Sequence, residues 1–378
     1  MKIIMNTREL VAATAVIGKV AVKESIIQFN MMKKQQGDKV FYAVTITAFD
    51  GKTQVASSLF AKSAKVDGNS VSFNMGYEIV GVIDAVSHEC DDITVEINSQ
   101  SVDIVAGNSR VTLKRKSEGL APVTFDLVNR DTIEEFFELN TAELKDAVDR
   151  VAVAVDNNLT AACPGICFTP MENGAMALRA VNGICLAQSV CQILSEQAKN
   201  RTGISTSSRL FKSVLATATG DMIRLYKTAS HMIVQCKPQL WQLPLLDNTL
   251  PDKAFENVLA GSRPVRIECK KDNMLNAIAV VQAAGQDNKR MYFNMQEGKI
   301  VISNFDKSAN TFITPDYMTG ELEETIMNVH FLKAVLGMVK GNELVMSYCN
   351  SSSPISIEEK GNDKSIAIIV PVKDKEGE

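Results

Sequence analysis

The sequence has 378 residues, of which 46% are hydrophobic and 6% aromatic, and its formal net charge is −4 at pH 7. At roughly 100 to 200 residues per domain, this length predicts several compact domains rather than one large core. The small negative charge excludes a protein that coats nucleic acid with its whole surface, although basic side chains can still gather on one face. No apolar run approaches about 18 residues, so the sequence predicts neither a transmembrane helix nor a membrane partner, and its N-terminus is too short and polar for a signal peptide.

The first predicted element of each third of the chain is an amphipathic helix. The motif Asn-Thr-x-Glu-Leu begins at Asn6 and again at Asn140, and a looser version precedes Leu275. Within 140–152 the apolar side chains follow the i, i+3, i+4, i+7 spacing that buries one stripe of a helix. That stripe consists of Leu144, Ala147, Val148 and Val151.

An extended region with a turn motif follows each first helix. The motif reads Ala48-Phe49-Asp50-Gly51, then Ala180-Val181-Asn182-Gly183, then Asn304-Phe305-Asp306-Lys307. A second helix comes next, marked by Val82-Ile83, Val214-Leu215 and Val335-Leu336, and alternating strands follow at 93–97, 223–226 and 344–348. All the markers recur at close to one third of the chain length. They predict three tandem repeats, at 1–127, 128–256 and 257–378.

The predicted fold class is α+β, with two helices packed on one face of antiparallel sheets in each repeat. Glycines at 107, 298 and 361 are expected to close hairpins. Repeats of this size are expected to lie side by side with their edge strands paired. Such an array leaves a free edge at repeat one and another at repeat three, which a second chain would satisfy by closing a ring.

The sequence offers little material for catalysis, for a metal or for a cofactor. Its histidines stand one per repeat, and no phosphate-binding, dinucleotide-binding, zinc-protease or serine-hydrolase motif is present. Cys163 and Cys167 are the best nucleophile or metal candidates, but no second Cys/His pair accompanies them. The eight cysteines mostly occupy apolar runs without a C-x-x-C pair, which is typical of buried, reduced thiols in a cytoplasmic protein.

Four motifs, in this order along a triplicated chain, carry a resemblance to a known family. Gly107-Asn108-Ser109-Arg110 resembles the family's G-x-S-R, and residues 180–187 stand in place of its A-T-D-G-x-R-L-A. Pro244 with Leu250-Pro251 resembles F-P-D-Y…L-P, and 367–373 resembles the closing apolar-Met-Pro-Met/Val-Arg/Lys strand. Over essentially its whole length, the chain resembles the bacterial sliding clamp, the beta subunit of DNA polymerase III.

The resemblance implies a homodimeric ring, closed head to tail, with helices lining the hole and sheets forming the rim. Such a ring encircles double-stranded DNA without reading its sequence and confers processivity on a polymerase. The implied partners are the DNA polymerase III alpha subunit, the clamp loader and other proteins with clamp-binding peptide motifs. The ring has no catalytic site and no cofactor of its own.

The resemblance also implies two sets of site residues. The candidates for facing DNA are basic residues on or beside the helices: Lys19, Lys23, Lys145, Arg150, Lys199, Arg201, Arg209, Lys212 and Lys333. Ordinary solvated helix faces would account for the same residues, and Glu78 and Asp84 break the pattern in repeat one. The candidates for a partner-peptide cleft are Cys163, Val181, Gly183, Leu186, Pro244, Ile355, Ile368, Val370, Pro371 and Val372. Core packing between neighbouring repeats would equally explain these.

The sequence departs from the family's pattern at three cleft positions and at its end. Val181, Cys185 and Asn248 replace a threonine, a basic residue and an arginine, and residues 374–378 extend past the usual terminus. An alternative function is therefore a protein-interaction scaffold with the same fold that does not encircle DNA. An enzyme that uses cysteine chemistry is a third, weaker hypothesis.

Overall fold

The computed structural model describes residues 1–123, 125, 132–155, 165–198, 202–246, 252–284, 289–321 and 323–372. The chain divides into two compact units. Unit 1 comprises Met1–Thr141, Ser195–Asn200 and Leu210–Leu245. Unit 2 comprises Ala142–Leu194, Arg201–Arg209 and Leu246–Glu378.

The helices form two per repeat, as predicted, with one addition, α5. Asn6 ends a strand and its side chain accepts a hydrogen bond from the Glu9 backbone N–H at 3.2 Å, which starts the first helix. Asn328 caps the start of α7 in the same way, through the backbone N–H of His330 at 3.0 Å. The helices are α1 (Thr7–Ile17), α2 (Glu78–Val86), α3 (Thr141–Val151), α4 (Ser208–Thr217), α5 (Asp252–Leu259), α6 (Lys271–Ala284) and α7 (Val329–Met338), with a short 3₁₀ turn at Ala152–Ala154.

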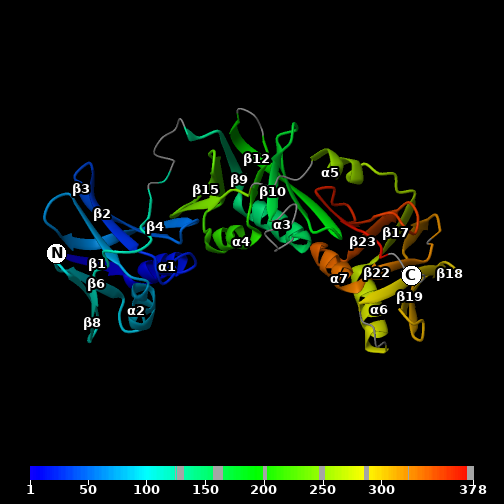
Figure 1. Cartoon of the computed structure of the whole chain (residues 1–378), viewed down its shortest axis with the longest axis horizontal. Coiled ribbons are helices and arrows are strands. Elements are labelled where there is room, and N and C mark those ends of the chain that lie inside the picture. Colours follow the sequence, from blue (N-terminus) through cyan, green and yellow to red (C-terminus); the bar gives the residue numbers. More distant parts are fainter. Residues whose placement is uncertain are drawn as a thin grey trace. The chain divides into compact units, whose positions relative to one another are not determined.

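In unit 1 the strands follow the order β8-β7-β6-β1-β4-β3-β2-β5, and β4 also pairs with β16 of the series β16-β15-β14-β9. Helix α1 packs against β1, β3 and β4 and against α2 (Figure 1). The strands are β1 (Lys2–Asn6), β2 (Ile27–Gln36), β3 (Lys39–Phe49), β4 (Gln54–Lys65), β5 (Ser70–Met75), β6 (Asp92–Ile97), β7 (Ser101–Ala106), β8 (Ser109–Lys114), β9 (Glu135–Asn140), β14 (Met222–Lys227), β15 (His231–Cys236) and β16 (Gln239–Pro244).

In unit 2 one sheet has the order β13-β10-β11-β12-β25-β24-β23-β17-β21, and a second has the order β20-β19-β18-β22. Helix α6 packs against β17, β19 and β20, and α7 packs against β22 and β25. The strands are β10 (Ile166–Pro170), β11 (Ala175–Val181), β12 (Cys185–Ala198), β13 (Ile204–Thr206), β17 (Val265–Lys270), β18 (Arg290–Gln296), β19 (Lys299–Asn304), β20 (Asn310–Ile313), β21 (Tyr317–Thr319), β22 (Thr325–Asn328), β23 (Glu343–Tyr348), β24 (Ile355–Glu359) and β25 (Ser365–Ile369).

One pairing scheme recurs along the chain. The β1·β6 pair corresponds to β9·β14 and β17·β23, and the series β5-β2-β3-β4 corresponds to β13-β10-β11-β12 and β22-β18-β19-β20. The hairpin β7–β8 likewise corresponds to β15–β16 and β24–β25. The antiparallel α+β fold is confirmed. The repeat boundaries themselves stay a prediction, because the two compact units divide the middle repeat.

The repeats join through equivalent edge strands, which confirms the predicted edge pairing. In unit 1, Ser57 of β4 lies opposite Gln239 of β16. In unit 2, Ser189 of β12 lies opposite Ser365, the first residue of β25. Among the described strands, β8 pairs only with β7, and β20 pairs only with β19.

The turn motif has the predicted role, with one correction. In the first two copies the acidic or amide side chain folds back onto the turn: Asp50 Oδ1 accepts from the Thr53 N–H at 2.6 Å, and Asn182 Oδ1 accepts from the Cys185 N–H at 2.7 Å. The third copy begins at Asn304, whose N–H bonds to the Ala309 carbonyl at 3.1 Å. It is two residues longer than the others, so Asn304 corresponds to Asp50 and Asn182 rather than to Ala48.

Candidate functional site

An apolar cluster covers one end of the β10–β11–β12 hairpins in unit 2. Cys167 of β10 and Phe255 of α5 are buried, and Val181 and Leu186, on either side of the turn, pack against them. Leu259, one helical turn after Phe255, completes the cluster. Two of these five residues, Val181 and Leu186, belong to the predicted partner-peptide cleft. The structure therefore brings part of the predicted cleft together, but with the chain's own helix α5 seated on it.

A buried arginine lies beneath α5. Arg179 of β11 is only 4% exposed, and its guanidinium carbon lies 4.9 Å from the centre of the Phe255 ring. The Arg179 Nε donates to Gln188 Oε1 at 2.9 Å, and its Nη2 lies 3.9 Å from the Glu256 carboxylate. A guanidinium that stacks on an aromatic ring and faces a carboxylate holds the helix by both attractions.

The C-terminal end of α5 has its own anchor. Arg263 donates from Nη1 to the carbonyls of Leu259 at 3.0 Å and Gly261 at 3.1 Å, and from Nη2 to the carbonyl of Val258. These carbonyls lack partners within the helix, because the last turn of any helix leaves its carbonyls unpaired. Arg263 thus satisfies the end of a short helix that would be marginal alone.

The end of β25 brings further predicted cleft residues close to this cluster. Ile368 lies opposite Leu186 across the β12–β25 pair, and the Val370 N–H donates to the Ile184 carbonyl at 2.9 Å. Val370 is 43% exposed, whereas Ile355 and Ile368 are each 1% exposed and belong to the core. The predicted closing strand ends at Ile369, and the chain continues irregularly to Val372, whose N–H bonds to the Ile326 carbonyl at 2.8 Å.

The remaining cleft candidates have varied positions. Gly183 is exposed in its turn at φ 82°, and Pro371 is partly buried. Pro244 ends β16 and belongs to unit 1, whereas the apolar cluster belongs to unit 2. Cys163, Asn248 and residues 374–378 lie outside the described residues. Cys167 lies in the apolar cluster where the sequence had suggested Cys163.

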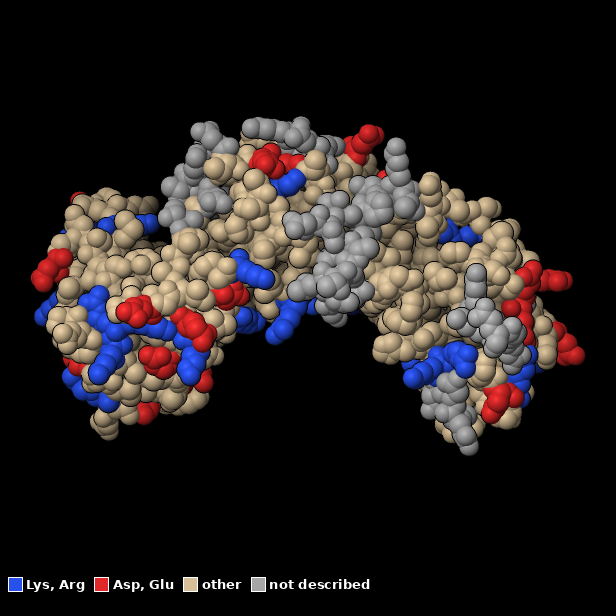
Figure 2. Space-filling view, in the orientation of Figure 1, with Lys and Arg blue, Asp and Glu red and all other residues tan. Residues whose placement is uncertain are grey.

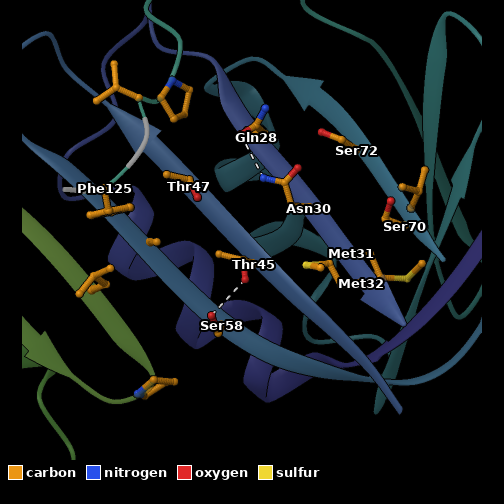
Figure 3. Close-up of a pocket in the computed structure, with 16 residues that line it drawn as sticks. Gln28, Asn30, Met31, Met32, Thr45, Thr47, Ser58, Ser70, Ser72 and Phe125 are labelled. Carbon is orange, nitrogen blue, oxygen red and sulfur yellow. Dashed lines mark hydrogen bonds between the residues drawn. The ribbon is translucent and has the colours of Figure 1, made fainter. Parts of the chain in front are cut away.

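Unit 1 has an open groove at the place equivalent to the α5 cluster. The groove encloses about 910 Å³ over the outer face of β2, β3 and β4, and Phe125, Pro238 and Leu240 lie along it. Figure 3 shows polar side chains along the floor beside Met31 and Met32. The Asn30 amide donates to Gln28 Oε1 at 3.0 Å, and the hydroxyl oxygens of Thr45 and Ser58 are hydrogen-bonded at 3.2 Å. The register places Gln28, Thr47 and Ala56 where unit 2 has Cys167, Arg179 and Gln188.

The described DNA-facing candidates, with one exception, are exposed. Lys145 lies on α3, Arg209 and Lys212 on α4, and Lys333 on α7, while Lys19 and Lys23 follow α1. Figure 2 shows blue side chains over α4, and blue and red ones intermingled over the N-terminal repeat. Summed over all six predicted helices, acidic and basic side chains are equal in number, although the first repeat has an excess of acidic ones and the other two have a small excess of basic ones. Lys199 and Arg201 lie outside the described residues.

Arg150 is the exception and corrects the prediction. The residue is 6% exposed, because its side chain turns from α3 toward the end of α7 and β24. There Nε donates to Asp146 at 2.6 Å, and Nη1 donates to Glu359 at 3.0 Å and to the Met338 carbonyl at 3.1 Å. Burial alone would lower the pKa of Arg150, but these two carboxylates raise it, so the guanidinium is a buried cation in an ion-pair network.

The described cysteines are free thiols, most of them buried. Burial raises the pKa of Cys185, Cys191, Cys236 and Cys269 to about 12, so these thiols hold their protons and are poor nucleophiles. Cys349 is exposed. Among the residues that the structure describes, no group of histidine, cysteine and acidic side chains is arranged to hold a metal ion. No helix of the described chain is long and apolar enough to span a membrane.

The residues that hold α5 were missed from the sequence. Phe255 and Leu259 stand at i and i+4 between Pro251 and Gly261, which is the pattern of a short amphipathic helix with its terminal signals. That signal was present, but no helix was predicted there, and the predicted boundary between repeats two and three crosses the segment. Nothing in the sequence near Arg179 indicated that its guanidinium would be buried.

Crystal structures of bacterial sliding clamps share the fold of this chain. The DNA polymerase III subunit beta from Pseudomonas aeruginosa aligns with a TM-score of 0.84 and 16% identity, over 99% of this chain and 100% of that one. The corresponding beta subunit from Thermotoga maritima gives 0.79 and 17%, over 99% of both chains. The DNA polymerase sliding clamp from Bacillus subtilis gives 0.81 and 15%, also over 99% of both. No protein-family model matches the chain, and no curated protein matches its sequence.

Proposed function

We propose that this chain is a DNA sliding clamp, of which two copies close head to tail into a ring around duplex DNA and hold a polymerase on it. The observation that carries the proposal is the repeated joint. Equivalent strands join the repeats at β4·β16 and at β12·β25, and the strands at the corresponding positions of the two outer repeats, β20 and β8, have no such partner among the described strands. An array whose two ends match each other closes when a second copy supplies the missing edge.

The joints inside the chain supply a register for the joint between chains. Ser57, Ser189 and Ile313 are each the fourth paired residue after the turn in their strands. Ser109, Gln239 and Ser365 each begin the opposing strand. If the joints are alike, Ser109 of one copy lies opposite Ile313 of the other. Val111 then lies opposite Thr311.

Topology, rather than charge, would retain the ring on DNA. Because the six predicted helices carry balanced charge, their attraction for phosphates is weak and its salt dependence shallow. Lys19, Lys23, Arg209, Lys212 and Lys333 would supply what attraction there is, partly through water. A weak, non-specific attraction permits sliding, while a closed ring prevents dissociation.

Partners would dock at the apolar cluster of unit 2. Val181 and Leu186, together with Val370 and Pro371, are the cleft candidates that the structure describes near its surface. Apolar side chains of this kind suit a short peptide with leucine or phenylalanine anchors. The proposed partners are a replicative polymerase, a clamp loader and other proteins that carry such peptides. The clamp itself contributes no catalytic step.

A cross-link at the proposed joint tests the ring. Residues directly opposite in an antiparallel pair have Cβ atoms about 4.5 to 5.5 Å apart, so Val111→Cys and Thr311→Cys in one chain should be joined by a short bifunctional thiol reagent. The expected product has twice 41.2 kDa, with both joints closed. When formed around circular double-stranded DNA, it should stay bound in high salt and be released by linearisation.

Each single-cysteine variant, treated in the same way, controls for reaction at the exposed Cys349. Light scattering of the unmodified chain across concentration supplies the uncross-linked mass. A monomer at every concentration, together with no cross-link in the double variant, would exclude the head-to-tail ring.

A second candidate function is a protein-interaction scaffold with the same fold. The balanced charge of the helices favours it, because a surface that faces DNA usually carries an excess of basic residues. Retention on circular DNA distinguishes the two functions. A scaffold would form the cross-linked dimer without being retained on circles, whereas a clamp would be retained until the DNA is cut.

The basic residues of α4 offer a finer test. Arg209→Glu combined with Lys212→Glu should shorten retention on circular DNA several-fold at low salt and have little effect at high salt, because only phosphate attraction is lost. Lys39→Glu, on an exposed lysine in the β2–β3 hairpin, is the control. Equal retention of the α4 variant and the control at low salt would remove these residues from the DNA-facing set.

A further inference from the structure

Helix α5 is seated on the cluster that would receive a partner peptide. Phe255 is 3% exposed and contacts the cluster of Cys167, Val181 and Leu186, and Leu259 packs beside it. An aromatic residue followed one helical turn later by leucine is also what an incoming amphipathic peptide would present to an apolar cleft. The helix thus makes the contacts that a ligand of this cleft would make.

The attachment of α5 to the sheet is local. Its polar contacts with the sheet include the Arg179 guanidinium under the Phe255 ring and the 3.9 Å approach of Arg179 to Glu256, whose side chain is 63% exposed. Arg263 caps the helix end from within the same segment and does not tie it to the sheet. A short helix whose anchors, among the described residues, are chiefly apolar side chains and a stacked arginine can leave its site without unfolding the sheet beneath.

Unit 1 shows that the underlying sheet face does not need a helical cover. Phe125 follows β8 by the same number of residues as Phe255 follows β16, and each lies at the same face of its β-sheet. Phe125 is only partly buried and leaves a groove of about 910 Å³. In unit 1 the floor mixes polar side chains such as Gln28 and Thr47 with apolar ones. In unit 2 Cys167, Val181 and Leu186 lie beside the buried Arg179, so α5 covers a surface that would otherwise expose hydrophobic side chains.

We infer that α5 is a tethered occupant of the partner-peptide cleft, which a partner must displace in order to dock. The inference rests on the proposed function for the identity of the cleft. It names the chemistry of the displacing ligand: a short peptide with an aromatic side chain to stack on Arg179 and an aliphatic side chain to replace Leu259 against Val181 and Leu186. An acidic side chain on the peptide would take the place of Glu256.

Tethering makes α5 a strong competitor despite its few contacts. A segment held next to its site has an effective concentration in about the millimolar range. The affinity of a peptide for the chain is reduced by the fraction of molecules in which α5 occupies the cleft. Removing the apolar anchors of α5 should therefore tighten peptide binding about tenfold or more.

The first experiment measures whether α5 covers the cluster, independently of any partner. Iodoacetamide modification of each cysteine is followed over time by mass spectrometry in the full chain. Phe255→Ala should raise the rate at Cys167 about tenfold or more, because its cover is lost, while the exposed Cys349 and the buried Cys185 keep their rates. Phe255→Leu, which keeps an apolar anchor, should preserve the protection, and Phe125→Ala should leave Cys167 unchanged. An unchanged Cys167 rate in Phe255→Ala overturns the inference.

The second experiment measures competition, with a labelled peptide that carries phenylalanine and, four residues later, leucine, and a control peptide with alanine at both positions. Fluorescence anisotropy should show tighter binding to the Phe255→Ala/Leu259→Ala variant than to the wild-type chain. Hydrogen exchange provides a test on the unaltered protein, because peptide binding to the wild type should accelerate exchange at 255–260.

The outcomes separate the inference from the proposed function. Equal affinity for wild type and variant, with no change in exchange at α5, leaves a peptide cleft but overturns the displacement. No binding to either chain, with Cys167 exposed in the variant, removes peptide docking from the proposed function and the inference with it. Tighter binding to the variant, with faster exchange of α5 in the wild type, supports both.

Discussion

The two linkers that follow β8 and β16 place equivalent phenylalanines on equivalent sheet faces, with different results. Around Phe125 the strands present Gln28, Thr47 and Asn30, and a groove stays open. Around Phe255 they present Cys167, Arg179 and Val181, and a helix closes over them. The same backbone scaffold thus has different covers in the two units. The side chains of β2 and β3 leave an open groove in unit 1, and those of β10 and β11 support a covered cleft in unit 2.

The largest expected difference between the units is in the free energy of unfolding that one helix residue contributes, at equivalent positions of α1 and α3. Arg150 is the tenth residue of α3, and the tenth residue of α1 is Val16, which is 4% exposed. Arg150→Ala should lower the free energy of unfolding by about 3 kcal/mol, because it leaves the Glu359 and Asp146 carboxylates without their partner. Val16→Ala should cost about 1 kcal/mol.

Urea denaturation of both variants, followed by circular dichroism, supplies that comparison. Arg150→Met, which keeps the volume without the charge, should be nearly as destabilising as Arg150→Ala, since the carboxylates remain unpaired in both. A loss below about 1 kcal/mol for Arg150→Ala would mean that the network is solvated and not buried.

The second largest expected difference is in the stability that the phenylalanine of each linker contributes. Phe255→Ala should destabilise unit 2 by about 2 to 3 kcal/mol, because a buried aromatic side chain and its stacked arginine are lost. Phe125→Ala should cost less than about 1 kcal/mol, because that ring is only partly buried. Thermal melts of the two variants against the wild type measure the difference, and equal shifts would contradict the contrast between the linkers.

The turns should behave alike in both units. Gly51 and Gly183 have φ of 98° and 82°, and an added Cβ at Gly183 would meet nothing within 4 Å. Replacement of either by alanine should therefore cost about 1 kcal/mol from backbone strain alone. Matched urea midpoints for the two variants would support the equivalence of the turns. A much larger effect of one substitution would show that its side chain meets an obstacle.

Lowering the pH should reduce the stability of unit 2 through protonation of Glu359. Burial alone would raise its pKa, but hydrogen bonds from Arg150, Asn362 and the Gly341 N–H outweigh burial and lower it below its usual range. A lowered folded-state pKa contributes stability that is fully present above the unfolded-state pKa of about 4.3 and is lost as the pH falls through the folded-state pKa. Unfolding free energy measured from pH 6 to pH 3 should fall less steeply in Glu359→Gln than in the wild type.

Much of this fold could be predicted from the sequence because its signals are local and repeated. The stripe at Leu144, Ala147, Val148 and Val151 is buried as expected, and the strands at 93–97, 223–226 and 344–348 form. The helical spacing and the strand alternation of apolar residues indicate which face is buried, and three copies of each marker support the same assignment. The edge pairing of the repeats followed from the same reasoning.

The site was harder to predict because it depends on contacts between distant segments. Charged residues lie near Arg150 in the sequence, which is typical of a solvated helix face. Its partner Glu359, however, comes from β24, far along the chain. Ile355 and Ile368 looked like cleft residues but are buried in a sheet whose pairing joins different repeats. Helix α5 has a local signal, but only the structure shows that Phe255 is seated on Val181 and Leu186.

The matching of β8 to β20 has a consequence for assembly that is separate from DNA. A surface that fits the opposite end of its own chain is a head-to-tail contact, and such contacts make closed rings only when the rotations at successive joints add up to a full turn. With any other rotation the same edges would build an open helical fibre. Small substitutions that alter the angle at β4·β16 or β12·β25 would therefore change the polymer that forms, even where they leave each repeat fully folded.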